Sequence, residues 1–272
     1  MNDFHRLYRQ GLLSLAFLLG LSSCAVEETV ESVSQSQITD NGDITIVYQK
    51  TSDKRFKDIR RALIDTEFFD DTIDDLNESL IFPTDISVVF TTCDEANAYY
   101  DPNSVEITMC YELIEEYLSI FAEDIETEED FEYEVIDASL FTFFHELGHA
   151  LVHLYDLPIT GKEEDAVDSF ATIILLDIYD DDLGALSGMF QFDAESDEER
   201  ENLESLPFWG EHALSAQRFY DTACLIYGSD PDYFDFLLED NYLPEERAQF
   251  CEAEYEQKSE AWETLLEPFW NE

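Results

Sequence analysis

The stretch His145-Glu146-Leu147-Gly148-His149 contains the residues of this sequence that are best suited to chemistry. Positions four apart point almost the same way on a helix, so His145 and His149 can present two imidazole rings to one metal ion. Glu146 lies one step round the helix, close enough to act on a water molecule held at that ion. The spacing therefore predicts two zinc ligands and a general base, the machinery of a zinc hydrolase.

The residues around this motif are largely apolar, which predicts that its helix is buried. Two unpaired histidines and a glutamate would be costly in such surroundings, and a bound metal would offset that cost. The alternative is a core helix that carries histidines by coincidence. His153 continues the stripe of His145 and His149, and we expect it near the helix end rather than at the metal.

A third ligand is expected from the segment that follows Pro158 and Gly161. Glu164 and Asp168 are four residues apart, and their face continues into apolar positions, so Glu164 should point inward. Asp168 then becomes an acceptor for an imidazole N–H. Glu163 and Asp165 stay open as alternative third ligands.

An HExxH motif followed by a helix with ExxxD resembles the gluzincin metallopeptidases, of which thermolysin is the best known. The resemblance implies a zincin-like fold and one zinc ion, held by His145, His149 and Glu164. It also implies that Glu146 activates water and that Asp168 orients His145. Here Glu164 follows the second histidine sooner than in thermolysin, which shortens the loop between the two helices.

More closely, the chain resembles a bacterial family of metallopeptidases whose function is not known. The similarity extends over roughly residues 45–270, but it implies little about the substrate. The matching segments are "CDEANAYYDP", "ITMCYELI", "FHELGHALVHLYDLPITGKEEDAVDSFA", "FWGEHALSAQRFYD" and "CEAEYEQKSEAWETLL".

A zinc peptidase also needs a group that stabilises the developing oxyanion. His212, Arg218 and Tyr220 are the candidates in "WGEHALSAQRFYD", and similarity to thermolysin-like enzymes favours His212. The alternative for His212 is a capping or packing role beside Glu211, and Arg218 can simply pair with a carboxylate. Zincins hold the substrate backbone on an edge strand, and Val105 to Cys110 could serve.

The pattern of elements predicts an α+β fold, with a small N-terminal sheet followed by a mostly helical remainder. Strands are expected at 44–48, 86–90 and 105–111, the last two as a long-looped hairpin. Helices are expected at 53–80, 112–121, from Asp137 or Ser139 to before Pro158, and from about Lys162 onward. The acidic segments 123–134 and 191–206 are expected to be a solvated loop and an insertion, and are candidates for a lid.

The first 23 residues are typical of an export signal, with Arg6 and Arg9 before a short apolar run. Leu21-Ser22-Ser23-Cys24 resembles a bacterial lipobox, which implies lipidation of Cys24. Residues 24–43 then form a flexible tether, and 44–272 the metallopeptidase domain. Ala25 after the cysteine implies the outer membrane, facing the periplasm. The alternative is an ordinary signal peptide.

Besides Cys24, the chain has Cys93, Cys110, Cys224 and Cys251. An even number in an exported chain predicts two disulfides, and of three possible pairings we favour sequence neighbours. The formal net charge is −52, from 13 basic and 65 acidic residues. Such a chain will not bind nucleic acid through its overall field.

The sequence therefore predicts an exported, lipid-anchored zinc hydrolase that acts on a peptide or protein substrate. One alternative is a catalytically weak, metal-binding envelope lipoprotein that acts as an interaction or assembly module. Glu146 argues against it, because a binding module has no use for a base there. A second alternative is a zinc hydrolase of a non-peptide amide, which the sequence does not separate from a peptidase.

Overall fold

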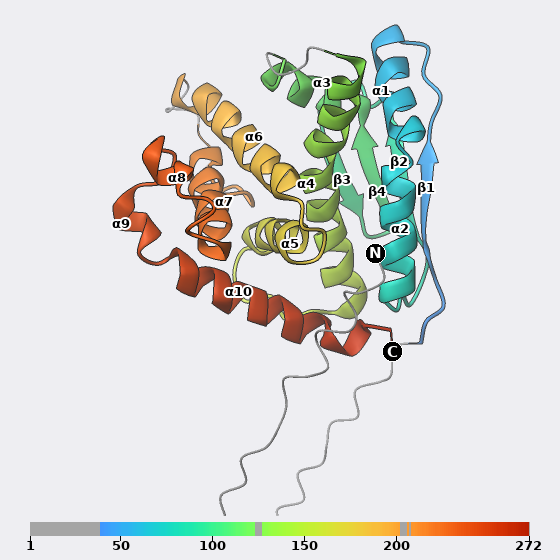
Figure 1. Cartoon of the computed structure of the whole chain (residues 1–272). Coiled ribbons are helices and arrows are strands. Elements are labelled where there is room, and N and C mark those ends of the chain that lie inside the picture. The colour runs from blue at the N-terminus through green and yellow to red at the C-terminus, as the bar shows by residue number, and fades with distance from the viewer. Residues whose placement is uncertain (1–38, 123–126, 202–205, 207, 272) are drawn as a thin grey trace, which may run out of the picture. The chain divides into compact units, whose positions relative to one another are not determined.

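A computed structural model describes residues 39–122, 127–201, 206 and 208–271. The predicted signal, Cys24 and most of the tether lie outside these residues. The described chain is α+β, as predicted: one small sheet is followed by a mostly helical part (Figure 1). The strands are β1 (Ile44–Tyr48), β2 (Ile86–Thr91), β3 (Ala98–Asp101) and β4 (Glu106–Cys110). The helices are α1 (Lys54–Asp65), α2 (Phe68–Ser79), α3 (Tyr111–Ile120), α4 (Glu128–Tyr155), α5 (Glu163–Asp177), α6 (Asp182–Glu201), α7 (Ser215–Ser229), α8 (Phe236–Glu239), α9 (Glu245–Ala248), α10 (Cys251–Leu266) and the 3-10 turn η3 (Glu267–Phe269).

The sheet has the strand order β1-β2-β4-β3. β1 pairs with β2 and β2 with β4 in parallel, whereas β3 is antiparallel to β4. The predicted hairpin between β2 and β4 is therefore wrong, because the unpredicted strand β3 lies between them in sequence and forms the hairpin with β4. β4 has neighbours on both sides, so it cannot be the strand that adds a substrate. The edge nearest α4 is β3, which packs against that helix.

The predicted helix over 53–80 is two helices. The chain turns at Glu67, where φ is 55°, and this breaks the helical hydrogen-bonding pattern between α1 and α2. α2 reaches both the sheet and α4 through Phe69, whose ring lies 5.1 Å from that of Phe90 and 5.5 Å from that of Phe143. The three rings lie in the core between strand β2 and helix α4.

Helix α4 carries the HELGH motif and lies between the sheet and the helices of the C-terminal half (Figure 1). It begins at Glu128, so the expected start at Asp137 or Ser139 is wrong, and most of the acidic segment 123–134 is helix rather than loop. The acidic insertion is likewise helical as far as Glu201. Helix formation here follows from burial: Val135, Ile136 and Leu140 pack into the core and extend the apolar face N-terminally.

Helices α4 and α5 pack closely, and Gly148 of the motif makes this possible. A Cβ atom at Gly148 would lie 2.9 Å from two side-chain carbons of Val167 and 3.1 Å from Phe170. Both contacts are shorter than normal van der Waals separations. The glycine therefore lets the start of α5, which carries Glu164, lie against the histidine turn of α4.

Both predicted disulfides are present. Cys93–Cys110 closes the segment after β2 that contains β3 and β4, and Cys224–Cys251 joins α7 to the start of α10. Two disulfides are typical of proteins in an oxidising, exported compartment. Among the described residues, we find no helix with the length and apolar character needed to span a bilayer.

We expect Gly148→Val to weaken both the fold and the metal site, because the new side chain must push α5 away from α4. The free energy of unfolding should fall by about 1–3 kcal/mol. Thermal unfolding with and without added zinc measures both effects. Gly161→Ala is the matched control, since a Cβ atom there has no heavy atom within 4 Å. Unchanged stability and zinc stabilisation in Gly148→Val would contradict the close packing.

Candidate metal centre

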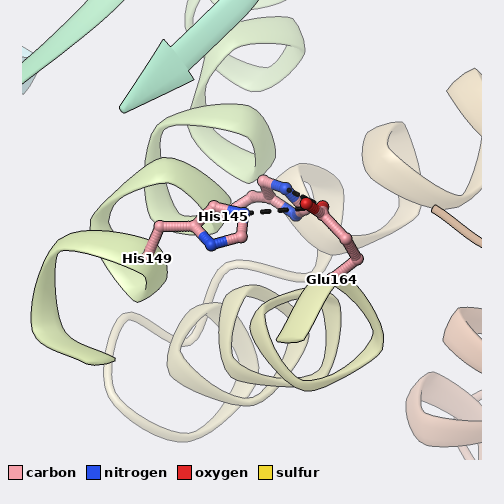
Figure 2. A group of neighbouring side chains, drawn as sticks. All are labelled: His145, His149 and Glu164. Atoms are coloured by element: carbon pink, nitrogen blue, oxygen red, sulfur yellow. Dashed lines mark ion pairs between the residues drawn. The ribbon is translucent and has the colours of Figure 1, made fainter. Parts of the chain in front are cut away.

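Three side chains from two helices converge on one point (Figure 2). His145 and His149 come from successive turns of α4, and Glu164 from the first turn of α5. Each offers one ligand atom, and these three atoms all lie within 4.8 Å of one another. Glu164 is thus the predicted carboxylate that the structure places with the two histidines.

The inner nitrogens of both rings face the same carboxylate oxygen. His145 Nε2 lies 3.3 Å and His149 Nε2 lies 3.5 Å from Glu164 Oε2. The outer nitrogens are occupied: His145 Nδ1 is 2.7 Å from Asp168 Oδ1, and His149 Nδ1 is 2.7 Å from Glu163 Oε1. An ionised carboxylate only accepts, so each Nδ1 must donate its proton. In the neutral rings, each Nε2 then carries a lone pair directed at Glu164.

These three ligand atoms are suited to bind a divalent metal ion. Two imidazole lone pairs and a carboxylate oxygen are all acceptors, and they repel one another unless a cation or a proton lies between them. Glu164 Oε2 is buried and lacks a hydrogen bond of acceptable geometry. Burial by itself raises the pKa of Glu164, but its contacts with His145, His149 and His212 outweigh this and hold the pKa far below its usual value. The site thus favours an ionised ligand.

The other two acidic residues considered as third ligands have different positions. Glu163 is the outer hydrogen-bond partner of His149. Asp165 is exposed, and its side chain lines a small cavity with Asp221 and Lys258 rather than contacting the imidazoles. Both flank Glu164 in the first turn of α5, and only Glu164 joins the cluster of His145 and His149.

Glu146 is almost fully buried, with 7% of its surface exposed. Burial raises its pKa above the ordinary value, although the neighbouring His145 and His149 oppose the shift. A raised pKa brings a carboxylate closer to the range in which it can both accept and return a proton near neutral pH. Its place on α4 between the two histidines is the one that the motif predicts.

Asp168 is held by a second partner that sequence reasoning did not assign. Arg218 of α7 donates from Nε to Asp168 Oδ2 and from Nη2 to Oδ1, both at 2.7 Å. Its guanidinium carbon also lies 3.9 Å from the centre of the Phe192 ring. Arg218, Asp168 and His145 therefore form a fixed chain that orients the first imidazole. The sequence around Arg218 did not indicate with which of the many carboxylates it would pair.

His212 lies at the centre. Its Nε2 is 2.9 Å from Glu164 Oε2, and its ring is nearly parallel to that of His145 at 6.5 Å between centroids. It comes from the loop between α6 and α7 and is largely exposed. Tyr220 is exposed, and its ring packs against that of Phe219. His153 Nδ1 lies 2.8 Å from the Tyr100 hydroxyl of β3 and is not part of the cluster.

Comparison with known families is consistent with this geometry. Residues 48–266 match the family described as "Putative metallopeptidase". The chain belongs to this family. No curated protein and no solved structure matches the chain. The family description and the cluster of His145, His149 and Glu164 together indicate a metal-dependent hydrolase.

We expect Arg218→Met to lower metal affinity about 10- to 100-fold, because Asp168 loses the partner that fixes it against His145. Stability should fall by about 3–5 kcal/mol, since Asp168 is then a buried charge with one partner fewer. The zinc affinity and the stability of Arg218→Lys should lie between those of the parent and those of Arg218→Met. Arg247→Met is the control: Arg247 pairs with Glu254 and Asp221 and should leave zinc affinity unchanged. Equal zinc affinity in all three variants would exclude this role.

The site should bind metal more tightly as pH rises. Burial lowers the pKa of His145, but hydrogen bonds to Asp168 and Glu164 outweigh burial and raise it to about 9. Without metal, the folded pKa lies above the unfolded value of about 6.5. The stability from protonated His145 is therefore complete below pH 6.5 and is lost as pH rises through about 9.

At pH 7.5 we accordingly expect zinc binding to displace about one proton. Calorimetric titration with zinc in buffers of different ionisation enthalpy measures this release. No release at pH 7.5, or affinity that falls between pH 6.5 and 9, would contradict a protonated His145.

Proposed function

We propose that this protein is a zinc-dependent metallopeptidase with a gluzincin-like centre. The observation that carries the proposal is the convergence of His145 Nε2, His149 Nε2 and Glu164 Oε2, with both Nδ1 atoms occupied by carboxylates. HExxH on one helix and ExxxD on the next fit this class, as does an antiparallel edge strand beside the motif helix. The fold is, on this proposal, zincin-like.

The ligands would be His145, His149 and Glu164. A bound zinc ion would polarise the scissile carbonyl and acidify a water molecule. As the water oxygen attacks the carbonyl carbon, the Glu146 carboxylate accepts a proton from that water. It returns this proton to the amine nitrogen when the C–N bond breaks. Asp168 keeps His145 in the tautomer that exposes Nε2. His212, which reaches the same point from the loop between α6 and α7, stabilises negative charge on the substrate oxygen.

Substrate binding is proposed along β3, the free edge of the sheet next to α4. A peptide added there is held by main-chain hydrogen bonds, whatever its sequence. The strongly acidic protein surface should favour cationic peptides over anionic ones. The exported location is supported by two disulfides. We further propose anchoring in the outer membrane through lipidated Cys24, which places the substrate in the cell envelope.

Metal content of purified residues 25–272 tests the centre. We expect about one zinc per chain, lost in Glu164→Ala and retained in the matched neighbour Asp165→Ala. Glu163→Ala should retain zinc with weaker affinity, because it only orients His149. Glu146→Gln should keep its zinc and lose peptide hydrolysis by about 100-fold or more. Elemental analysis and cleavage of a peptide mixture are the two measurements.

The outcomes separate the alternatives. Zinc without cleavage of any peptide in the parent would favour the envelope-module function or a non-peptide amide substrate. Zinc lost in Asp165→Ala but kept in Glu164→Ala would identify Asp165, and not Glu164, as the third ligand. Absence of zinc from the parent, even after incubation with the metal, would indicate that the motif belongs to a core helix that carries histidines by coincidence.

A further inference from the structure

The loop between α6 and α7 presents two aromatic side chains to solvent. Phe208 is 73% exposed and Trp209 is 84% exposed, more than any other large hydrophobic side chain in the described part of the chain. Large apolar groups held in water gain free energy when a partner covers them, and tryptophan is prominent at binding sites. We refer to residues 208–212 as the aromatic loop.

Lys162 fastens the aromatic loop to the metal centre. Its Nζ donates to the carbonyl oxygen of Gly210 at 3.3 Å and of His212 at 3.2 Å. Lys162 is also the N-cap residue of α5, directly before Glu163 and Glu164. One side chain thus fixes the main chain of the loop to the turn that supplies the carboxylate ligand.

The far end of the aromatic loop lies at the centre itself, because His212 Nε2 is 2.9 Å from Glu164 Oε2. Trp209 is three residues before His212. An extended chain advances about 3.3–3.6 Å per residue, so the Trp209 backbone lies within about 11 Å of that of His212. A bound peptide advances by the same length per residue. Trp209 is thus within reach of substrate positions about three residues from the scissile bond.

We propose that Phe208 and Trp209 form a subsite for a large apolar side chain of the peptide substrate, within about three residues of the scissile bond. Lys162 is the positioning residue that holds this subsite and His212 in place. The inference depends on the proposed peptidase function and adds to it the substrate class. It joins two preferences in one substrate: an apolar residue near the bond and cationic residues further out, where the acidic surface acts.

The test uses zinc-loaded protein and a library of end-blocked octapeptides with four randomised central positions. Cleaved peptides are identified by mass spectrometry, and kcat and KM are measured for the best peptide and for the same peptide with alanine at the preferred position. We expect the parent to select a large apolar residue. Phe208→Ser/Trp209→Ser should reduce that selectivity about 10-fold or more, mainly through KM.

Lys162→Met should reduce the selectivity in the same way, and Lys162→Arg should restore it, because a guanidinium can still donate to both carbonyls. Zinc content should be unchanged in the aromatic variants. Tyr233→Ser is the matched control: Tyr233 is 62% exposed and lies in the loop between α7 and α8, outside the aromatic loop. Binding of the best peptide to Glu146→Gln, by calorimetry, should weaken about 10-fold when the two aromatic substitutions are added.

Cleavage with the same preference in parent and double variant would overturn this inference alone. So would a double variant whose only change is in self-association or vesicle binding, measured by sedimentation. If the zinc-loaded parent cleaves no peptide of the library, the proposed peptidase function fails, and this inference fails with it.

Discussion

Acceptor atoms that converge inside a protein need a positive charge between them, and this constraint organises the C-terminal half of the molecule. Glu164 Oε2 faces two imidazole nitrogens at 3.3 and 3.5 Å. When both rings are neutral and their Nδ1 protons are donated to Asp168 and Glu163, none of these three atoms can donate. A proton or a divalent cation relieves the repulsion. The close contact of α4 and α5 at Gly148 maintains the convergence, because it holds the two helices at a fixed separation.

Charge around the centre is arranged in layers. The inner atoms are acceptors, and the outer imidazole nitrogens donate to carboxylates. Asp168 in turn accepts from Arg218, one of only 13 basic residues in a chain with 65 acidic ones. Its two contacts of 2.7 Å stabilise an ionised Asp168 despite burial. That carboxylate in turn fixes the tautomer of His145. In a protein of such acidity, the position of this partly buried arginine indicates that the orientation of the His145 ring matters.

The two halves of the fold contribute different things to the centre. The sheet and α1, α2 support α4 through an aromatic core that includes Phe69, Phe90 and Phe143, and they provide β3 as a free strand edge. The helical half supplies every partner that gives the histidine turn its chemistry. α5 brings Glu164 and Asp168, α7 brings Arg218, and the aromatic loop brings His212. The disulfide Cys224–Cys251 braces this half between α7 and α10.

The sequence alone determined what depends on short spacing. His145 and His149 share a helix face because four residues make about one turn, and Glu164 and Asp168 share one for the same reason. Cysteines close in sequence gave the correct disulfide partners, and short runs rich in β-branched residues gave β1, β2 and β4. Only the tertiary structure decided which carboxylate meets which ring, that Arg218 selects Asp168, and that β3 rather than β4 is the edge. Those contacts join residues 14 to 50 positions apart, and their partners are chosen by packing of whole elements, which no local periodicity records.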